Sequence, residues 1–557
     1  RKRGLQRHEY DQFSVGYFVG SGGRPNDPNK VLDSGLSAIE EIRAGMKSAD
    51  RFKFISVCPD CQIEGRGTNS IELKGDTNRN RIYHICKKCG REVPLYITDV
   101  EVFARLPTMV ISTIDKWATI STIPESKTIF GIVRSRCPTH GYSCFDDKCM
   151  FLPRDKRCSS VNKMPALYDG PPSIMVQDEL HMLGESLGAL ASQYETFLKN
   201  LAGTVGSVEG MSSKGQWKII ASTATIAGYE RHMKSMYLKD SDIFPVKGPS
   251  ASQSFYFSHN KEMAQRLIVG FVPHSMTHPN AVIKTLQYFH AFVKRFEQEP
   301  GKLAKDYPSM FARLTPTEES NLFKLVRTSL MYGIVKSETY QILNSVEDQI
   351  DPYLKSVGIK DGIKETADVT GDTDPQDNIE LLQKMKDPSL PSNPEFIVAT
   401  SSISHGVDIR QLNFMTFRGQ PRSVAEYIQA MSRVGRKYQG IVFAIYNPNR
   451  ERDASHYMLH NEFLSIADVL ISPPAVDRFS RQAVDKSADG IIMGGMMFRE
   501  RDKRLIRASE FVARQRDPKF LTGLKQFFIS SYLPAGSESM VPDFDSFERY
   551  VSDTFDV

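Results

Sequence analysis

Four short apolar runs in this chain each lead directly into a polar segment whose side chains suit catalysis. The runs cover Ser173–Val176, Lys218–Ser222, Phe396–Thr400 and Phe414–Phe417. Runs of this length, bounded by polar residues, are typical of buried strands in parallel sheets. Open α/β sheets bind their ligands at the carboxyl ends of such strands. The pattern therefore predicts an α/β protein whose chemistry lies in the segments that follow the strands.

The length and composition of the chain predict a multidomain globular protein. At 557 residues the chain is long enough for three or four domains, at roughly 150 residues per domain. No stretch approaches the ~18 uninterrupted apolar residues of a membrane span, and polar residues follow Arg1–Gly4. We therefore expect a cytoplasmic protein with no membrane partner. The net charge of +5 leaves nucleic-acid binding open, because such binding needs only a local basic groove.

Two adjacent carboxylates follow the first apolar run. Asp178 is suited to holding the Mg²⁺ of a nucleotide, and Glu179 to orienting and deprotonating an attacking water. These are the two tasks that phosphoryl transfer to water requires. A strand followed by Asp-Glu is common by itself, so the assignment depends on the motifs around it.

Two arginines, Arg433 and Arg436, follow the last apolar run and lie three residues apart. If this segment is helical they lie one turn apart, so both guanidinium groups can address one triphosphate. An arginine that stabilises a transferring phosphoryl group accelerates the transfer by about 10³ to 10⁵. In isolation, two solvated arginines on a helix would explain the pattern equally well.

All eight cysteines fall between positions 58 and 158. Two Cys-x-x-Cys knuckles predict a zinc ribbon in which Cys58, Cys61, Cys86 and Cys89 bind one Zn²⁺. Disulfides and unliganded thiols are the alternatives, although disulfides are rare in cytosolic proteins. A closed site with four protein ligands leaves no position for a catalytic water, so we expect a structural role. Contact of the ribbon with nucleic acid is the alternative role.

The other four cysteines predict a second zinc site with irregular spacing. Its expected ligands are Cys137, Cys144, Cys149 and Cys158. His140 is an alternative ligand, so five side chains compete for four positions. Alternatively, one or two of these thiols simply pack in a core and His140 lies on the surface.

The order of these segments resembles that of the motifs in superfamily 2 helicases of the DExH type. Asp178–His181 resembles motif II, Thr223–Thr225 motif III, Ser401–Asp408 motif V and Gln429–Arg436 motif VI. The resemblance implies two RecA-like parallel-sheet lobes, with cysteine-rich inserts in the first lobe and a mostly helical C-terminal region. It also implies ATP and Mg²⁺ as cofactors, beside the Zn²⁺ of the cysteine sites, and movement along nucleic acid.

The resemblance further implies a role for each matching residue. Catalytic roles fall to Asp178, Glu179, His181, Gln429, Arg433 and Arg436. Nucleotide binding falls to Asp178, Gly406, Asp408, Arg433 and Arg436. Thr223 and Thr225 would couple the nucleotide to the nucleic acid, and the nucleic acid itself would be bound by Thr113, Thr400, Ser401, Ser402, Gly23 and Arg24.

Within this superfamily the chain most resembles the DrmA-type helicase subunit of the DISARM phage-defence system. The resemblance lies in Asp178–Glu185, in Ala430–Arg436, in the glycine-rich loop at 20–26 and in the cysteine inserts before motif II. It implies DNA as the substrate, single- or double-stranded, and a partner subunit in an antiviral complex. Proteins of two other functional classes have all or some of these motifs. One is an ATP-driven remodeller that does not separate strands, and the other is a nucleic-acid-binding module that does not hydrolyse ATP.

One expected motif is absent from the sequence. A phosphate-binding Gly-x-x-x-x-Gly-Lys loop is not found, and the single Gly-Lys pair, Gly301-Lys302, lacks the upstream glycine. We expect this loop to precede Arg1, so that residues 1–557 alone bind ATP poorly. The expected domains are a first lobe at 1–240, with inserts at 50–95 and 131–165, a connector at 241–280, a second lobe at 281–450 and a helical region at 451–557.

Overall fold

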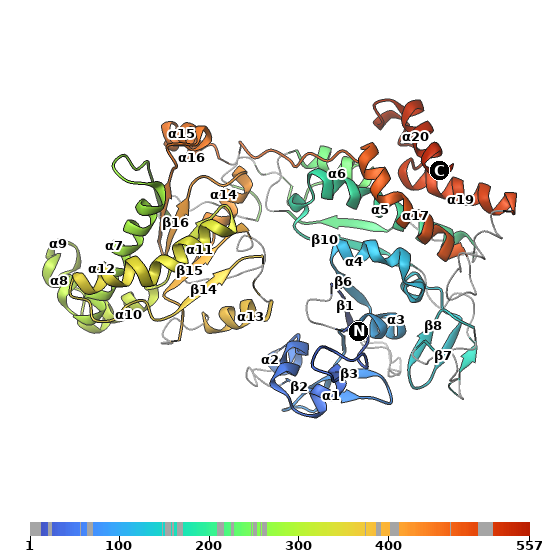
Figure 1. The fold of residues 1–557 in the computed structure, drawn as a ribbon, viewed down its shortest axis with the longest axis horizontal. Helices are drawn as coiled ribbons and strands as arrows, with labels where there is room; N and C mark the ends of the chain where they lie inside the picture. The colour runs from blue at the N-terminus through green and yellow to red at the C-terminus, as the bar shows by residue number, and fades with distance from the viewer. Residues whose placement is uncertain are drawn as a thin grey trace. The chain divides into compact units, whose positions relative to one another are not determined.

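The computed structural model divides into two compact units (Figure 1). The first unit comprises Arg1–Thr223, Tyr229–Ser241 and Pro474–Val557, and the second comprises Ala224–Gly228 and Asp242–Pro473. The structure describes residues 13–20, 25–55, 57–63, 71–146, 149–150, 158, 161–163, 171–208, 217–223, 228–246, 248, 253–256, 258, 264–371, 373, 375–385, 392–401, 412–467, 469–499 and 516–556.

The second unit is built on a six-stranded sheet in which every paired strand is parallel. In spatial order the strands are β12 (Arg266–Phe271), β17 (Gly440–Ile445), β16 (Phe414–Arg418), β13 (Ser329–Gly333), β15 (Phe396–Ala399) and β14 (Thr366–Val369). The central strands β13, β15 and β16 are buried along their whole length. Because both faces of these strands are buried, their sequences are mainly apolar and do not show the apolar–polar alternation of a half-exposed strand.

Helices cover both faces of this sheet and enclose a core on each. Leu330 and Tyr332 of β13 face one core, whereas Met331 faces the other, because side chains alternate along a strand. The first core is closed by α13 (Pro375–Lys384), α14 (Val424–Met431) and α16 (His460–Ser465). The second is closed by α7 (His278–Gln298), α11 (Lys336–Ser345) and α12 (Asp351–Ser356). The described part of this unit also contains the α-helices α8 (Lys302–Asp306), α9 (Pro308–Phe311), α10 (Pro316–Val326) and α15 (Glu451–Met458) and a π-helical turn at Val346–Ile350.

The first unit contains two separate parallel sheets among its described residues. One has the order β5 (Leu95–Tyr96), β1 (Val15–Phe18) and β6 (Met109–Ser112), and the other pairs β10 (Ile174–Gln177) with β11 (Lys218–Ala221). The 24-residue helix α5 (Glu185–Val208) follows β10, and α6 (Tyr229–Tyr237) follows β11. Shorter helices of this unit are α1 (Ala38–Arg43), α2 (Pro59–Ile63), α3 (Asp99–Arg105) and α4 (Ile114–Ala118).

Two small antiparallel sheets carry the cysteine segments. The first consists of β2 (Ile71–Asp76), β3 (Arg81–Cys86) and β4 (Glu92–Val93). The second consists of β8 (Gly141–Ser143), β7 (Ser135–Cys137) and β9 (Asn162–Lys163). Both lie within the predicted inserts at 50–95 and 131–165.

The C-terminal helices belong to the first unit. Helices α17 (Arg481–Arg499), α19 (Pro518–Tyr532) and α20 (Phe544–Asp556) share one apolar core with α5. Phe197 and Leu201 of α5 pack there with Ile491 of α17 and Phe528 of α19. This core shows that helices α17, α19 and α20 are a structural part of the first unit.

The α/β class with a parallel six-stranded sheet and substantial helical content is confirmed, but two predicted boundaries differ from the structure. Strand β12 lies within the predicted connector 241–280 and forms an edge of the second sheet. The predicted helical region 451–557 is divided between the units, because α15 and α16 belong to the second unit and residues from 474 onward to the first. Across the part of the chain that the structure describes, no helix has the length and apolar character that spanning a membrane would require.

Candidate nucleotide site and metal centres

Asp178 and Glu179 lie in a tight turn at the carboxyl end of β10. The backbone of Glu179 has φ of 50°, in the left-handed region that non-glycine residues seldom adopt. Its N–H donates to Asp178 Oδ1 at 3.0 Å. Asp178 is exposed and Glu179 half-buried, so both carboxylates are open to a ligand. A strained backbone at an exposed pair of acids is typical of a functional site.

Strand β11 brings the hydroxyl of Ser222 to Asp178. The two strands are parallel with Gln177 beside Ala221, so the next residue, Ser222, lies beside Asp178. The Ser222 hydroxyl donates to Asp178 Oδ1, and the Leu180 N–H donates to the Ser222 carbonyl at 2.8 Å. Sequence reasoning did not select Ser222, although its place directly after the apolar run was a signal for it.

His181 joins the same network. Its Nδ1 lies 3.3 Å from the Thr223 hydroxyl and 3.4 Å from Glu179 Oε2. Asp178, Glu179, His181 and Thr223 were all named from the sequence. His181 contacts Glu179 and Thr223 directly, and Asp178 accepts from Ser222, the residue before Thr223. The arrangement can transmit a change at the carboxylates to the segment that follows β11.

Several predicted residues lie outside the described part of the chain. These are Gly23, Arg24, Thr225, Ser402, Gly406 and Asp408. Of the other predicted nucleic-acid residues, Thr113 follows β6 and is exposed at the start of α4. Thr400 and Ser401 follow β15 in the second unit, where Thr400 is buried and Ser401 is exposed.

The motif VI arginines lie beyond the end of a helix. Helix α14 contains the buried Gln429 but ends at Met431, so Arg433 and Arg436 are not one helical turn apart as predicted. The chain turns out of the helix because Val434 forms a bridge with Leu412. Arg433 is half-buried, and Arg436 is exposed.

Arg266 of β12 supports the turn that carries these arginines. Its guanidinium group donates to the carbonyls of Val434 and, at 3.3 Å, of Ser432. Burial lowers the pKa of Arg266, and the positive charge of Arg436 lowers it further. Sequence reasoning missed Arg266 because it placed this residue in a connector.

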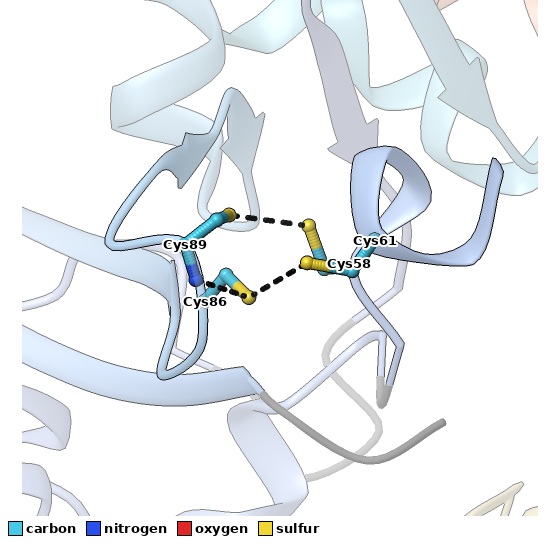
Figure 2. A group of neighbouring side chains, drawn as sticks. All are labelled: Cys58, Cys61, Cys86 and Cys89. Carbon is cyan, nitrogen blue, oxygen red and sulfur yellow. Dashed lines mark hydrogen bonds between the residues drawn. The ribbon is translucent and has the colours of Figure 1, made fainter. Parts of the chain in front are cut away.

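The first group of cysteines converges as the spacing predicted (Figure 2). Cys58 Sγ lies 3.9 Å from Cys89 Sγ, and Cys61 Sγ lies 3.7 Å from Cys86 Sγ. A tetrahedral ion with Zn–S bonds of about 2.3 Å would separate its ligand atoms by roughly 3.8 Å. The donor set and its spacing therefore fit Zn²⁺.

The surroundings of these cysteines oppose the charged thiolate form when no cation is bound. Burial, followed by the neighbouring Cys86, raises the pKa of Cys61 to about 12. Without a cation the four cysteines would stay protonated, because a buried, apolar environment and the charge of neighbouring thiolates both disfavour the thiolate form. A bound cation reverses this balance by stabilising four thiolates at once.

The second group consists of Cys137, His140, Cys149 and Cys158, whose ligand atoms all lie within 4.8 Å of one another. His140 Nδ1 lies 3.4 Å from Cys137 Sγ and 3.4 Å from Cys158 Sγ. The predicted ligand Cys144 is not in this group, and its thiol lies 3.4 Å from the Pro124 carbonyl oxygen. His140, the predicted alternative, thus takes the place of Cys144 in this group, because the turn after β7 directs the imidazole toward the thiols.

A second contact fixes the imidazole of His140. Its Nε2 lies 2.9 Å from the carbonyl oxygen of Asn78, in the turn between β2 and β3. Since a carbonyl only accepts, Nε2 carries the proton and Nδ1 presents its lone pair to the thiols. Burial lowers the pKa of His140, which favours the neutral imidazole that metal ligation requires.

Comparison with known proteins identifies two sequence similarities. Residues 332–438 match the family described as helicase conserved C-terminal domain. Over 500 residues the chain is 27% identical to the DISARM protein DrmA of Bacillus paralicheniformis, a match that covers 80% of this chain and 39% of that protein. The chain thus spans less than half the length of this curated relative.

Two solved helicase structures are also similar. One is DUF1998 helicase MrfA bound to DNA, with 12% identity, a TM-score of 0.42 and coverage of 86% of this chain and 46% of that chain. The other is Mycobacterium smegmatis helicase Lhr bound to ssDNA and AMP-PNP, with 13% identity, a TM-score of 0.43 and coverage of 90% and 49%. At these TM-scores the similarity does not bear on activity.

Proposed function

We propose that this chain, which is of the superfamily 2 helicase type and close to DrmA, is part of an ATP-driven motor that moves along DNA in antiviral defence. One observation supports the proposal: two side chains after β10 contact hydroxyls after β11, the Asp178 carboxylate that of Ser222 and the His181 imidazole that of Thr223. A motor needs such a link, because hydrolysis must be coupled to a change elsewhere in the protein.

The residues of the first unit divide the hydrolytic work between them. Asp178 would hold Mg²⁺, which when bound neutralises charge on the phosphate oxygens of ATP. Glu179 orients the attacking water and accepts its proton, a role that suits its half-buried position next to His181. His181 and Thr223 pass the state of the carboxylates to the chain that follows β11.

The second unit supplies positive charge. Arg433 and Arg436 stabilise the charge that develops on the transferring phosphoryl group, and Gln429, buried near the end of α14, is proposed to act with them. Arg266 holds the turn on which both arginines lie.

We propose that each of the two cysteine groups binds one structural zinc ion. Each group offers four donors from one chain, which leaves no open position for a catalytic water. The ions would fix the small antiparallel sheets of the first unit, which are too small to maintain a core of their own.

DNA as the substrate, a partner subunit and action in the cytoplasm are proposed from the similarity to DrmA. Thr113, Thr400 and Ser401 are the described candidates for contact with the DNA backbone, although the burial of Thr400 leaves mainly its backbone for this role.

A comparison of two assays on the complete protein tests the function. We expect ATP hydrolysis that DNA stimulates, together with displacement of a labelled strand from a partial duplex. Movement along DNA without strand displacement would identify a remodeller instead. No hydrolysis with any nucleic acid would contradict the motor and leave a binding module.

A further inference from the structure

A short segment that follows the second unit returns to the loop that carries the catalytic acids. Residues Pro474 to Arg478, here called the strap, belong to the first unit, whereas Pro473 belongs to the second. The Glu185 N–H donates to the Ala475 carbonyl of the strap at 2.6 Å. Along the strap, Ala475 and Asp477 are exposed and the alternate residues are at least half-buried, so one face of the strap is held against the protein.

The strap lies so close to this loop that only glycine fits at two positions. A methyl group added to Gly184 would lie 2.8 Å from Pro474 Cβ, and one added to Gly188 would lie 2.7 Å from Val476 Cγ2. Neither glycine has a positive φ, so backbone conformation does not require glycine there. At Gly184 the close approach of the strap requires glycine. At Gly188 the strap does so together with the Leu183 carbonyl oxygen, which an added methyl group would meet at 2.9 Å.

The strap also packs on the residues that follow Glu179. Val476 contacts the apolar cluster that contains Leu180 and Leu183. The Leu183 carbonyl accepts from His232 Nε2 of α6 at 2.8 Å. The loop is therefore held between the strap and the helix that follows motif III.

Arg478 anchors the end of the strap. Its side chain is 2% exposed and donates to the Met236 carbonyl at 3.1 Å and the Thr196 hydroxyl at 2.6 Å. The backbone carbonyl of Arg478 also accepts a hydrogen bond from Gln193 Nε2 at 2.9 Å. A buried guanidinium group with several acceptors is costly to displace, so one end of the strap is fixed to both α5 and α6.

We propose that the strap is a positioning element that holds the Asp178–Glu185 loop in the geometry for hydrolysis and links this loop directly to the chain leaving the second unit. The proposal rests on the proposed function, because it assumes that the loop hydrolyses ATP. It assigns a role to Gly184, Gly188 and Pro474–Arg478, none of which would touch the nucleotide.

A pair of complementary substitutions tests the proposal in the complete protein. Gly184→Ala places a methyl group against Pro474 Cβ and should lower kcat roughly tenfold or more while leaving KM for ATP within about threefold. Adding Pro474→Gly removes the opposing Cβ, so kcat of the double variant should return to within about threefold of that of Pro474→Gly alone. Ala475→Ser is the matched control, because its exposed side chain leaves the strap in place.

Hydrogen exchange gives a readout that does not depend on hydrolysis. The amides of residues 178–185 should exchange faster in Gly184→Ala, and the double variant should regain the slower exchange. Absent hydrolysis in the unsubstituted protein would contradict the proposed function, while exchange would still report on the strap. Unchanged exchange in Gly184→Ala, or a loss that Pro474→Gly does not reverse, would overturn the strap as the positioning element.

Discussion

The hydroxyl of Ser222 reaches Asp178 because β10 and β11 are parallel and in a register that sets Gln177 beside Ala221. Neither residue is unusual by itself. If the pairing of β11 with β10 were shifted by one residue, the Ser222 hydroxyl would point to the opposite face of the sheet. At the scale of single residues, the chemistry of this site therefore depends on strand register as much as on which residues are present.

Glu195 of α5 is a second residue whose surroundings determine its behaviour. It is fully buried, and burial raises its pKa to about 7, although Trp217 Nε1 donates to it at 2.8 Å and Lys239 and Arg478 favour its charged form. The folded state therefore binds this proton more tightly than the unfolded chain does. The stabilisation is complete below the unfolded pKa near 4.5 and is lost as the pH rises through about 7.

We therefore predict that the first unit becomes less stable between pH 5 and pH 8, by on the order of 3 kcal/mol. Glu195→Gln should remove most of this dependence, because the amide still accepts from Trp217 and carries no charge. Urea unfolding of both proteins across this range measures the effect. Parallel pH profiles for the two proteins would show that Glu195 is not the group responsible.

At the scale of elements, each cysteine group lies on a small antiparallel sheet that we propose a zinc ion stabilises. We predict two Zn²⁺ per chain by metal analysis, one lost in Cys86→Ser together with a lower melting temperature. Cys144→Ser is the matched control and should retain both ions, because Cys144 lies outside the second group. Protein purified without chelator and found free of zinc would refute both centres.

The elements that could be predicted from the sequence are those that local pattern determines. The apolar run at 396–400 contains β15, which is buried along its whole length, as expected of a run of apolar residues in a parallel sheet. The run at 173–176 overlaps β10, but this strand was wrongly expected to be buried, because Ile174 and Val176 are exposed. The choice of His140 over Cys144 could not be predicted, since it depends on the turn after β7. The end of α14 was also missed, because the bridge between Leu412 and Val434 is a tertiary contact.

At the scale of the whole molecule, the C-terminal residues were expected to form a separate region and instead complete the core of the first unit. Their apolar residues recur at helical spacing, which shows that they pack but not against which partner. The chain thus leaves the first unit, forms the second and returns through the strap.

The arginines of the second unit provide a prediction at this scale. Arg436→Ala should lower ATP turnover and abolish its stimulation by nucleic acid, because the guanidinium group supplies charge stabilisation worth about 10³ or more in rate. Lys437→Ala is the control, since it removes an exposed neighbouring cation. Stimulation that survives in Arg436→Ala at its normal level would exclude Arg436 from this role.

The most direct test of the account is the turnover of Glu179→Gln in the complete protein. The substitution keeps the shape of the side chain and removes the base, so ATP and DNA should still bind while turnover falls roughly a hundredfold or more. Glu230→Gln, an exposed carboxylate on α6, should leave turnover unchanged. Steady-state hydrolysis by Glu179→Gln at the rate of the unsubstituted protein would contradict the assignment of Glu179 and with it the proposed catalytic site.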